Sequence, residues 1–353
     1  WSVSGEKRGF ATCPPAGEGS GPWNPGLGPE LPRHLLPLST IFRPENVFNS
    51  VEHAHEARDF TGLELQELVV FRPQRLVLHE LLIRITSDLS VPAGSLYEEL
   101  GINFRKMADC IDQGWIAPRM DDIVGEYERM RTELENFIDE ELGATIFRPA
   151  PAEPERGGLW AGVSRLFGRG EPAEAQDDAG PEHEERVRRE WGRKACCEDD
   201  PMRRAAYRAL SRAVSAMHIK HGRMWADRDV LARLAVGMAA NDYCSEAIGR
   251  LIEPWIEEAA TQLGYVRLPA QARPIVLNTK GASASGKSTL RPMQERLVER
   301  IGERWVDFAL ISPDIWRKYL LDYASLGQAS MYAGALTGIE LEIIDHKLDR
   351  YMA

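Results

Sequence analysis

The residues best suited to chemistry lie in one Gly- and Ser-rich stretch: Gly281, Ala282, Ser283, Ala284, Ser285, Gly286, Lys287, Ser288 and Thr289. The first eight fit the phosphate-loop pattern G-x-x-x-x-G-K-[ST]. In such a loop the backbone N–H groups converge on phosphate oxygens, and glycine allows their close approach. Lys287 would bind the β- and γ-phosphates and Ser288 would ligate Mg²⁺, so ATP or GTP with Mg²⁺ are the expected cofactors. The alternative is a Gly/Ser turn with a solvated lysine.

The elements around this motif decide between the two interpretations. The apolar, β-branched run "IVLN" at 275–278 predicts a buried strand before the loop, and a helix is expected over roughly 287–302. "WVDFALIS" at 305–312 predicts a second strand, and two further helical patterns follow it. This β-α-β-α alternation predicts a parallel sheet with helices on its faces, so the motif has the strand–loop–helix context that it requires.

Asp314 comes just after the second predicted strand. Ligands of doubly wound sheets bind at the carboxyl ends of the strands. An aspartate there could accept a proton from a substrate hydroxyl or hold Mg²⁺ through water. Equally, the Pro313-Asp314 pair suits the cap of a helix that begins at Ile315, and position alone does not choose between these roles.

The segment "GASASGKSTLR", followed by a strand, "SPD" and "IWRKYL", resembles the zeta-toxin-like P-loop kinases. The likeness covers about the last 80 residues of the chain. It implies that Lys287 binds phosphate, Ser288 binds the metal and Asp314 is the base that activates a hydroxyl. Arg291 matches an arginine position of the family, with an outward salt bridge as the alternative. Members of that family phosphorylate small hydroxyl substrates such as the sugar of a UDP-amino sugar, and a protein antitoxin or regulator is an implied partner.

The chain ends at Ala353, before a third strand, an acidic motif or an arginine-bearing lid. Two parallel strands cannot bury both faces of a sheet, so we expect a fragment or a truncated product. The arginines that would stabilise the transition state are then expected in the missing part. Arg317, Lys318 and Arg350 are available cations, although each is predicted to be a solvated helix charge.

Helical patterns dominate the rest of the chain. Pro73 predicts the start of a buried helix, and an apolar stripe predicts a second helix that begins near Asp121 and stops at Gly143; the stripe comprises Ile123, Tyr127, Met130, Leu134, Phe137 and Leu142. We divide the chain into a disordered leader (1–34), a helical domain (35–148), an acidic Pro/Gly linker (149–185), a helical segment (186–268) and the first part of a P-loop kinase domain (269–353). The predicted fold class is a mainly α N-terminal region followed by an α/β P-loop NTPase with an incomplete parallel sheet.

The remaining polar residues are expected to have structural roles and not to bind ligands. The cluster His53, His55, Glu56 and Asp59 matches no familiar zinc spacing, and His218 and His221 suit a solvated helix face. Asn241, Asp242 and Ser245 are predicted to cap a helix. Arg72, Arg75 and Arg84 lie among apolar positions, so an internal ion-pair network is expected around them.

The composition of the chain limits the classes of partner that we expect. The net charge of −11 opposes nucleic-acid binding, and the five cysteines include no CxxC pair, which favours a reducing, cytoplasmic location. The sequence contains no run of 18 apolar residues, so no membrane span is predicted. We therefore expect an ATP-dependent phosphotransferase acting on a small-molecule hydroxyl, with a helical regulatory region. The alternatives are a helical interaction module that uses nucleotide binding as a switch, and, less favoured by the charge, a nucleic-acid 5′-hydroxyl kinase.

Overall fold

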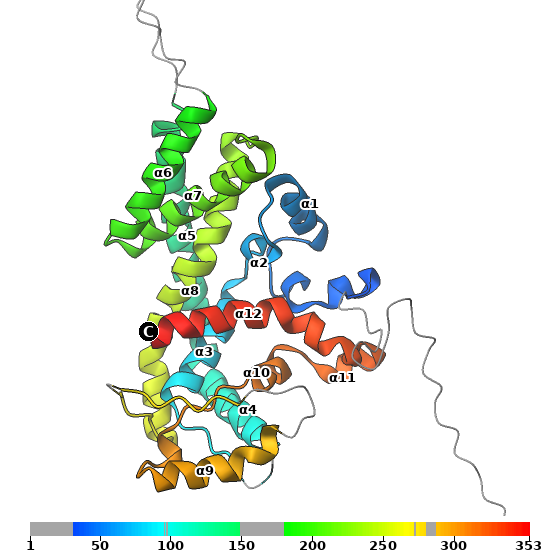
Figure 1. The fold of residues 1–353 in the computed structure, drawn as a ribbon, viewed down its shortest axis with the longest axis vertical. Helices are drawn as coiled ribbons and strands as arrows, with labels where there is room; N and C mark the ends of the chain where they lie inside the picture. The colour runs from blue at the N-terminus through cyan, green and yellow to red at the C-terminus, as the bar shows by residue number, and fades with distance from the viewer. Residues whose placement is uncertain (1–30, 95, 97, 149–179, 272, 280–286) are drawn as a thin grey trace, which may run out of the picture.

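The computed structural model describes residues 31–94, 96, 98–148, 180–271, 273–279 and 287–353 (Figure 1). Within these ranges the protein is mainly α. The extended pairing that they contain is limited to two isolated antiparallel bridges, Val47 with Phe71 and Leu89 with Arg267. The predicted leader and linker lie largely outside the described residues.

The predicted α/β fold class is wrong, because neither expected strand forms in the described part of the chain. Residues 274–279 follow an irregular path, Val276 is 79% exposed, and Trp305–Asp307 form a short 3₁₀-helix. A β-branched run satisfies its backbone N–H and C=O groups only beside a partner strand. The described residues offer no such partner to 274–279, so the local pattern does not produce a sheet.

Five long helices build the main body: α3 (Pro73–Asp88), α5 (Met120–Ala144), α6 (Pro181–Cys197), α7 (Pro201–His221) and α8 (Arg228–Leu263). Pro73 is the first residue of α3, as predicted, and most of this helix is buried because apolar side chains surround it. Helix α8 runs along the body and packs against α3, α5 and α7 (Figure 1). Its end at Gly264, in left-handed backbone geometry (φ +69°), confirms the predicted stop.

The apolar stripe of α5 is confirmed with one shift of register. Ile138 is fully buried where the pattern predicted Phe137, which is half-buried. Gly143 does not stop the helix, which continues to Ala144. The lack of a side chain at Gly143 matters for packing, because a Cβ at this position would lie 2.9 Å from a guanidinium nitrogen of Arg228. The glycine therefore allows close approach of that side chain.

Further helices complete the fold, and the longest of them is α12: α1 (Val51–Thr61), α2 (Leu65–Leu68), α4 (Glu99–Ile111), α9 (Arg291–Arg300), α10 (Pro313–Leu320), α11 (Tyr323–Leu326) and α12 (Ala333–Met352). In Figure 1, α12 crosses the body and ends beside α8, whereas α9 lies at the lower end of the molecule. Helix α10 packs on α4 and α12, and its buried Trp316 donates an indole N–H to Thr86 of α3 (3.0 Å). The last part of the chain thus packs on the helical body.

Candidate functional site

The phosphate-loop motif is only partly described. Residues 280–286, and with them Gly281 to Gly286, lie outside the described residues, as do the side chains of Lys287 and Ser288. The backbone from Lys287 to Leu290 forms a 3₁₀ turn that leads directly into α9, and Thr289 is exposed. The predicted helix after the motif is therefore present.

The two sides of the motif are held together by a hydrogen bond. The Gln294 side-chain amide, in the second turn of α9, donates to the Thr279 hydroxyl at 2.7 Å. Thr279, just before the motif, therefore contacts α9, the helix that follows Lys287. Loop entry and helix start are adjacent, as a phosphate loop requires, although the strand that should precede the loop is missing.

Asp314 lies in the first turn of α10, and its side chain is 64% exposed. The helix begins at Pro313 with Ser312 as its N-cap, so Asp314 is not the cap. Its carboxylate accepts a hydrogen bond from Arg317, one turn along, at 2.5 Å. A carboxylate in the first turn stabilises a helix through the positive end of its dipole. The expected position at the edge of a sheet is not seen.

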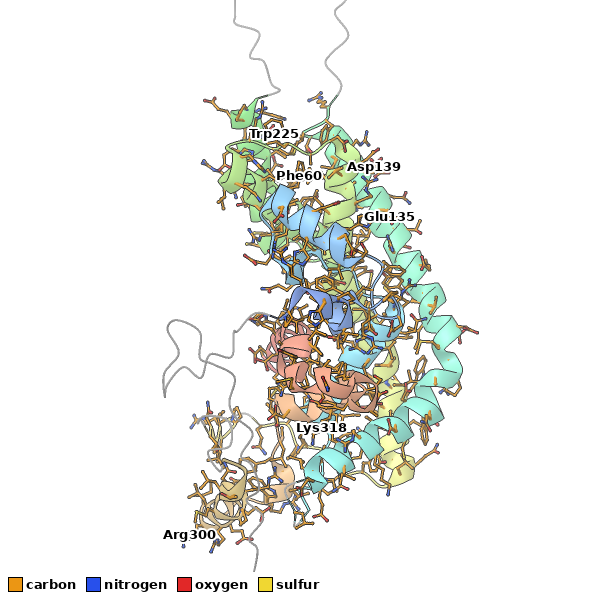
Figure 2. The ribbon with its side chains drawn as sticks, turned by 90° about the vertical axis from the view of Figure 1, so that its right-hand side faces the viewer. Phe60, Glu135, Asp139, Trp225, Arg300 and Lys318 are labelled. Atoms are coloured by element: carbon orange, nitrogen blue, oxygen red, sulfur yellow. The ribbon has the colours of Figure 1, made fainter. Side chains whose placement is uncertain are left out.

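The other cations considered with Asp314 have separate surroundings. Arg317 also donates to the Thr337 hydroxyl (3.2 Å), and Arg350 forms an ion pair with Asp242 (2.6 Å). Lys318 is exposed and lies on the surface in Figure 2. Helix α9, which ends at Arg300, occupies the lower end of the same view.

A second group of polar residues is buried between α3 and α12. The Arg75 guanidinium donates two hydrogen bonds to the Glu340 carboxylate, at 2.5 and 2.7 Å. His79 Nε2 lies 2.7 Å from Glu340 Oε1, and its Nδ1 lies 3.3 Å from Lys347 Nζ. An ammonium can only donate and a carboxylate can only accept. These partners therefore fit a neutral His79 that donates through Nε2 and accepts at Nδ1.

The group continues from Lys347 into α8 and back to α3. Lys347 Nζ donates to the Ser245 hydroxyl (2.7 Å), which lies 2.5 Å from Glu80 Oε1. Glu80 in turn accepts from Arg84 at 2.6 Å. We call the seven residues that these contacts connect the buried polar network: Arg75, His79, Glu80, Arg84, Ser245, Glu340 and Lys347.

Burial and neighbouring charges set the protonation of this network. Burial, with the nearby Lys347 ammonium, lowers the pKa of His79 to about 4. Burial also lowers the pKa of Lys347 to about 8, against the opposing effect of Glu80. The pKa of Glu340 is lowered although burial alone would raise it, because the positive charge of Arg75 and the bonds from His79 and Arg75 favour the carboxylate. Near neutral pH, Glu340 is thus charged and His79 is neutral.

Sequence reasoning found part of this network. The prediction of internal ion pairs is confirmed for Arg75 and Arg84, whereas Arg72 donates to backbone carbonyls of Pro44 and Val47. The prediction that Asn241, Asp242 and Ser245 cap a helix is wrong, since all three lie inside α8. Asn241 bonds the backbone of Val69 and Phe71.

Four network residues were missed: His79, Glu80, Glu340 and Lys347. A signal was available, because Arg75 with His79 and Glu80 with Arg84 are each four residues apart on one apolar helix. Glu340 and Lys347 are seven residues apart, which places them on one face of α12. Their partners on α3 lie more than 250 positions away, so no local pattern connects the two helices.

A pocket of about 400 Å³ opens beside the network, between α3, α7, α8 and α12. Glu80, Arg84, Ser245 and Lys347 line it from the network side. Arg204 and Arg208 come from α7. A volume of this size suits a small ligand.

Three of the histidines considered as ligands contact other elements of the protein. His218 Nε2 lies 2.8 Å from Glu184, and His221 Nε2 lies 2.7 Å from the Phe60 carbonyl. The His55 ring packs against Phe42, with 5.9 Å between centroids. In the part of the chain that the structure describes, no three His, Cys, Asp or Glu side chains form a group that could hold a metal ion.

Comparisons with known proteins add no relative: no family model, curated protein or solved structure matches this chain. Across the described ranges, none of the helices combines the length and apolar character needed to cross a bilayer. The functional argument therefore depends on the motif, the buried polar network and the pocket.

Proposed function

We propose that this chain binds a nucleotide through residues 281–288 and is an ATP-dependent phosphotransferase acting on a hydroxyl of a small molecule. One observation carries the proposal. The motif G-x-x-x-x-G-K-S runs directly into a helical turn at Lys287, and the Gln294–Thr279 hydrogen bond holds its flanks together. Of the expected strand–loop–helix context, the strand does not form in the described residues, so the proposal depends on the motif and its loop–helix junction alone.

Each residue has a definite role in this proposal. Lys287 would neutralise the charge of the β- and γ-phosphates, and the Ser288 hydroxyl would hold Mg²⁺. Bound Mg-ATP would supply the phosphoryl group. Asp314 would accept the proton of the acceptor hydroxyl as the oxygen attacks, after exchanging its contact with Arg317 for the substrate. A nucleotide sugar is one acceptor of suitable chemistry, by resemblance to the zeta-toxin-like kinases.

The experiment is a binding and turnover measurement on the full chain. Calorimetry with Mg-ATP and with Mg-GTP should show binding that Lys287→Ala abolishes and that the exposed-lysine control Lys318→Ala leaves unchanged. Mass spectrometry of a metabolite extract incubated with ATP should reveal a phosphorylated acceptor. If the intact protein ignores both nucleotides at millimolar concentration, the proposal fails.

A second candidate is a helical interaction module in which the nucleotide acts as a switch. It is favoured by the exposed, Arg317-paired Asp314 and by the packing of α10 and α12 on the helical body. Slow hydrolysis without a phosphorylated acceptor, together with a regulator or antitoxin bound in one nucleotide state only, would select this function. The net charge of −11 argues against the nucleic-acid 5′-hydroxyl kinase.

A cytoplasmic location is part of the proposal. Among the described cysteines, Cys110, Cys196, Cys197 and Cys244 are free thiols. Free thiols persist in reducing compartments. Detection of the native protein in the soluble fraction with the two exposed thiols, Cys196 and Cys197, still alkylatable would test the assignment.

A further inference from the structure

The pocket between α3, α7, α8 and α12 is rich in positive charge. Five basic side chains line it against three acidic ones; the bases are Arg84, Arg204, Arg208, Lys347 and Arg350, and the acids are Glu80, Asp242 and Glu246. This surplus contrasts with the acidic chain as a whole, whose net charge is −11. A local excess of cations in a concave site attracts anions.

The acidic side chains of the pocket are already engaged. Glu80 accepts from both Arg84 and Ser245, and Glu246 pairs with Arg250, which does not line the pocket. Asp242 alone serves two arginines, Arg208 at 2.8 Å and Arg350 at 2.6 Å. One carboxylate between two guanidinium groups leaves a net positive charge at this wall.

One arginine of the pocket, Arg204, has no acidic partner within the described residues. Arg204 donates to the backbone carbonyl of Glu198 (3.1 Å), and within the described residues no carboxylate lies at ion-pair distance from it. Arg84, by contrast, already pairs with Glu80 (2.6 Å) and with Glu253 (3.7 Å), and its unpartnered Nε is buried out of reach of the pocket. Its guanidinium lies over the Tyr351 ring, 4.7 Å from the centroid, which fixes its plane. Guanidinium groups recognise phosphate through donors that no carboxylate engages, and Arg204 offers such donors.

We propose that this pocket binds a small phosphate-bearing molecule, a phosphomonoester, with Arg204, Arg208 and Arg350 on its phosphate. The proposed site is separate from the phosphate-loop motif, because none of the four helices that form it contains a residue of 281–288. Lys347, whose pKa is lowered to about 8 by burial, would gain a counter-charge when the phosphate enters. A pocket of about 400 Å³ also leaves room for the organic part of the ester.

The test uses the full chain carrying Lys287→Ala, so that the nucleotide motif contributes nothing to binding. The probe is ribose 5-phosphate, measured by calorimetry, with ribose as the uncharged control. Ribose 5-phosphate should bind and ribose should not. Because the motif is already disabled, this result does not depend on whether the protein is a phosphotransferase.

Three substitutions and one control locate the site. Arg204→Gln and Arg208→Gln should each weaken binding of ribose 5-phosphate about tenfold, since each removes a charged hydrogen-bond donor. Arg233→Gln, an exposed arginine of α8 outside the pocket, is the matched control and should change nothing. Asp242→Asn should strengthen binding about two- to fivefold, because the carboxylate no longer competes with the phosphate for Arg208 and Arg350.

The gain with Asp242→Asn separates a ligand site from a structural ion-pair cluster. If the ion pairs served only to hold the helices together, removal of Asp242 would lower the melting temperature without raising the affinity for ribose 5-phosphate. The proposal is overturned by that result. It is equally overturned if the Lys287→Ala chain does not bind ribose 5-phosphate at millimolar concentration, or if the two arginine variants bind it as the control does.

Discussion

The helical body buries its apolar residues, whereas the described residues of the segment 274–312 (274–279 and 287–312) leave most of theirs exposed. In α3, α5 and α8 the apolar side chains are buried against one another, and charged residues among them find partners. In the other segment Val276 is 79% exposed and Met293 of α9 is 61% exposed, and only Val298 of α9 is buried. Both regions carry clear apolar patterns, but only the first has surfaces that match them.

The difference teaches how much a pattern requires from the rest of the chain. An amphipathic helix satisfies its own backbone and needs only one apolar surface to pack against. A strand needs a hydrogen-bonded partner strand on at least one edge and cover for its apolar face. The run at 275–278 meets neither requirement in the described structure, so this short apolar run stays irregular.

The largest expected loss of stability follows from removal of a buried charge in the helical body. Glu340→Ala should destabilise the protein by about 3–5 kcal/mol, because it leaves the buried Arg75 guanidinium without its carboxylate. Urea unfolding followed by circular dichroism would measure the loss. Glu342→Ala, an exposed acid on the same helix, is the control and should change little. Equal effects for both variants would contradict the buried ion pair.

The second largest expected effect is a loss of free energy of unfolding at acid pH. The pKa of His79 is about 4 in the fold and 6.5 in the unfolded chain, so the unfolded state binds more protons between these values. Stability should therefore fall as the pH drops from 6.5 to 4, by about 3 kcal/mol from this residue. Protonation would also take Nδ1 away from Lys347 as an acceptor.

The pH dependence is measurable by urea unfolding at a series of pH values. In His79→Gln the slope between pH 6.5 and 4 should be much smaller than in the parent chain. The same slope in both proteins would show that another group carries the dependence.

Packing against α8 gives a smaller effect. A Cβ on Gly249 would lie 2.3 Å from Glu80 Oε2 and 2.5 Å from an Arg84 nitrogen, so Gly249→Ala should destabilise by about 1–3 kcal/mol. The control is Gly338→Ala on α12, where a Cβ meets nothing within 4 Å. That change should stabilise slightly, by about 0.5–1 kcal/mol, since alanine favours a helix more than glycine does. Thermal unfolding of the two variants should shift in opposite directions.

The smallest effect is expected in the exposed segment. Val276→Ser should alter the free energy of unfolding by no more than about 0.5 kcal/mol, because the side chain is already in water. Val77→Ser, at a buried position of α3, is the comparison and should cost far more. A large loss with Val276→Ser would mean that 274–279 packs against a partner in solution.

The helical part of the fold was predictable because its signals are local. Pro73 at the first position of α3, the stripe of α5 and the stop at Gly264 each follow from neighbouring residues. The candidate site divides in the same way. The motif around Lys287 is a sequence feature, whereas the pairing of Arg75 with Glu340 joins residues 265 positions apart. The position of Asp242 before an amphipathic pattern predicts a helix cap, whereas its actual partners, Arg208 and Arg350, lie far from it in sequence.

The sequence by itself determined the helices and the presence of a phosphate-loop pattern, since backbone preference, glycine placement and apolar spacing act over a few residues. Only the tertiary structure decided that no strand forms in the described ranges, and that α3, α8 and α12 enclose charges which satisfy one another. The physical reason is that sheet edges and buried charges require partners. In this protein those partners come from distant parts of the chain.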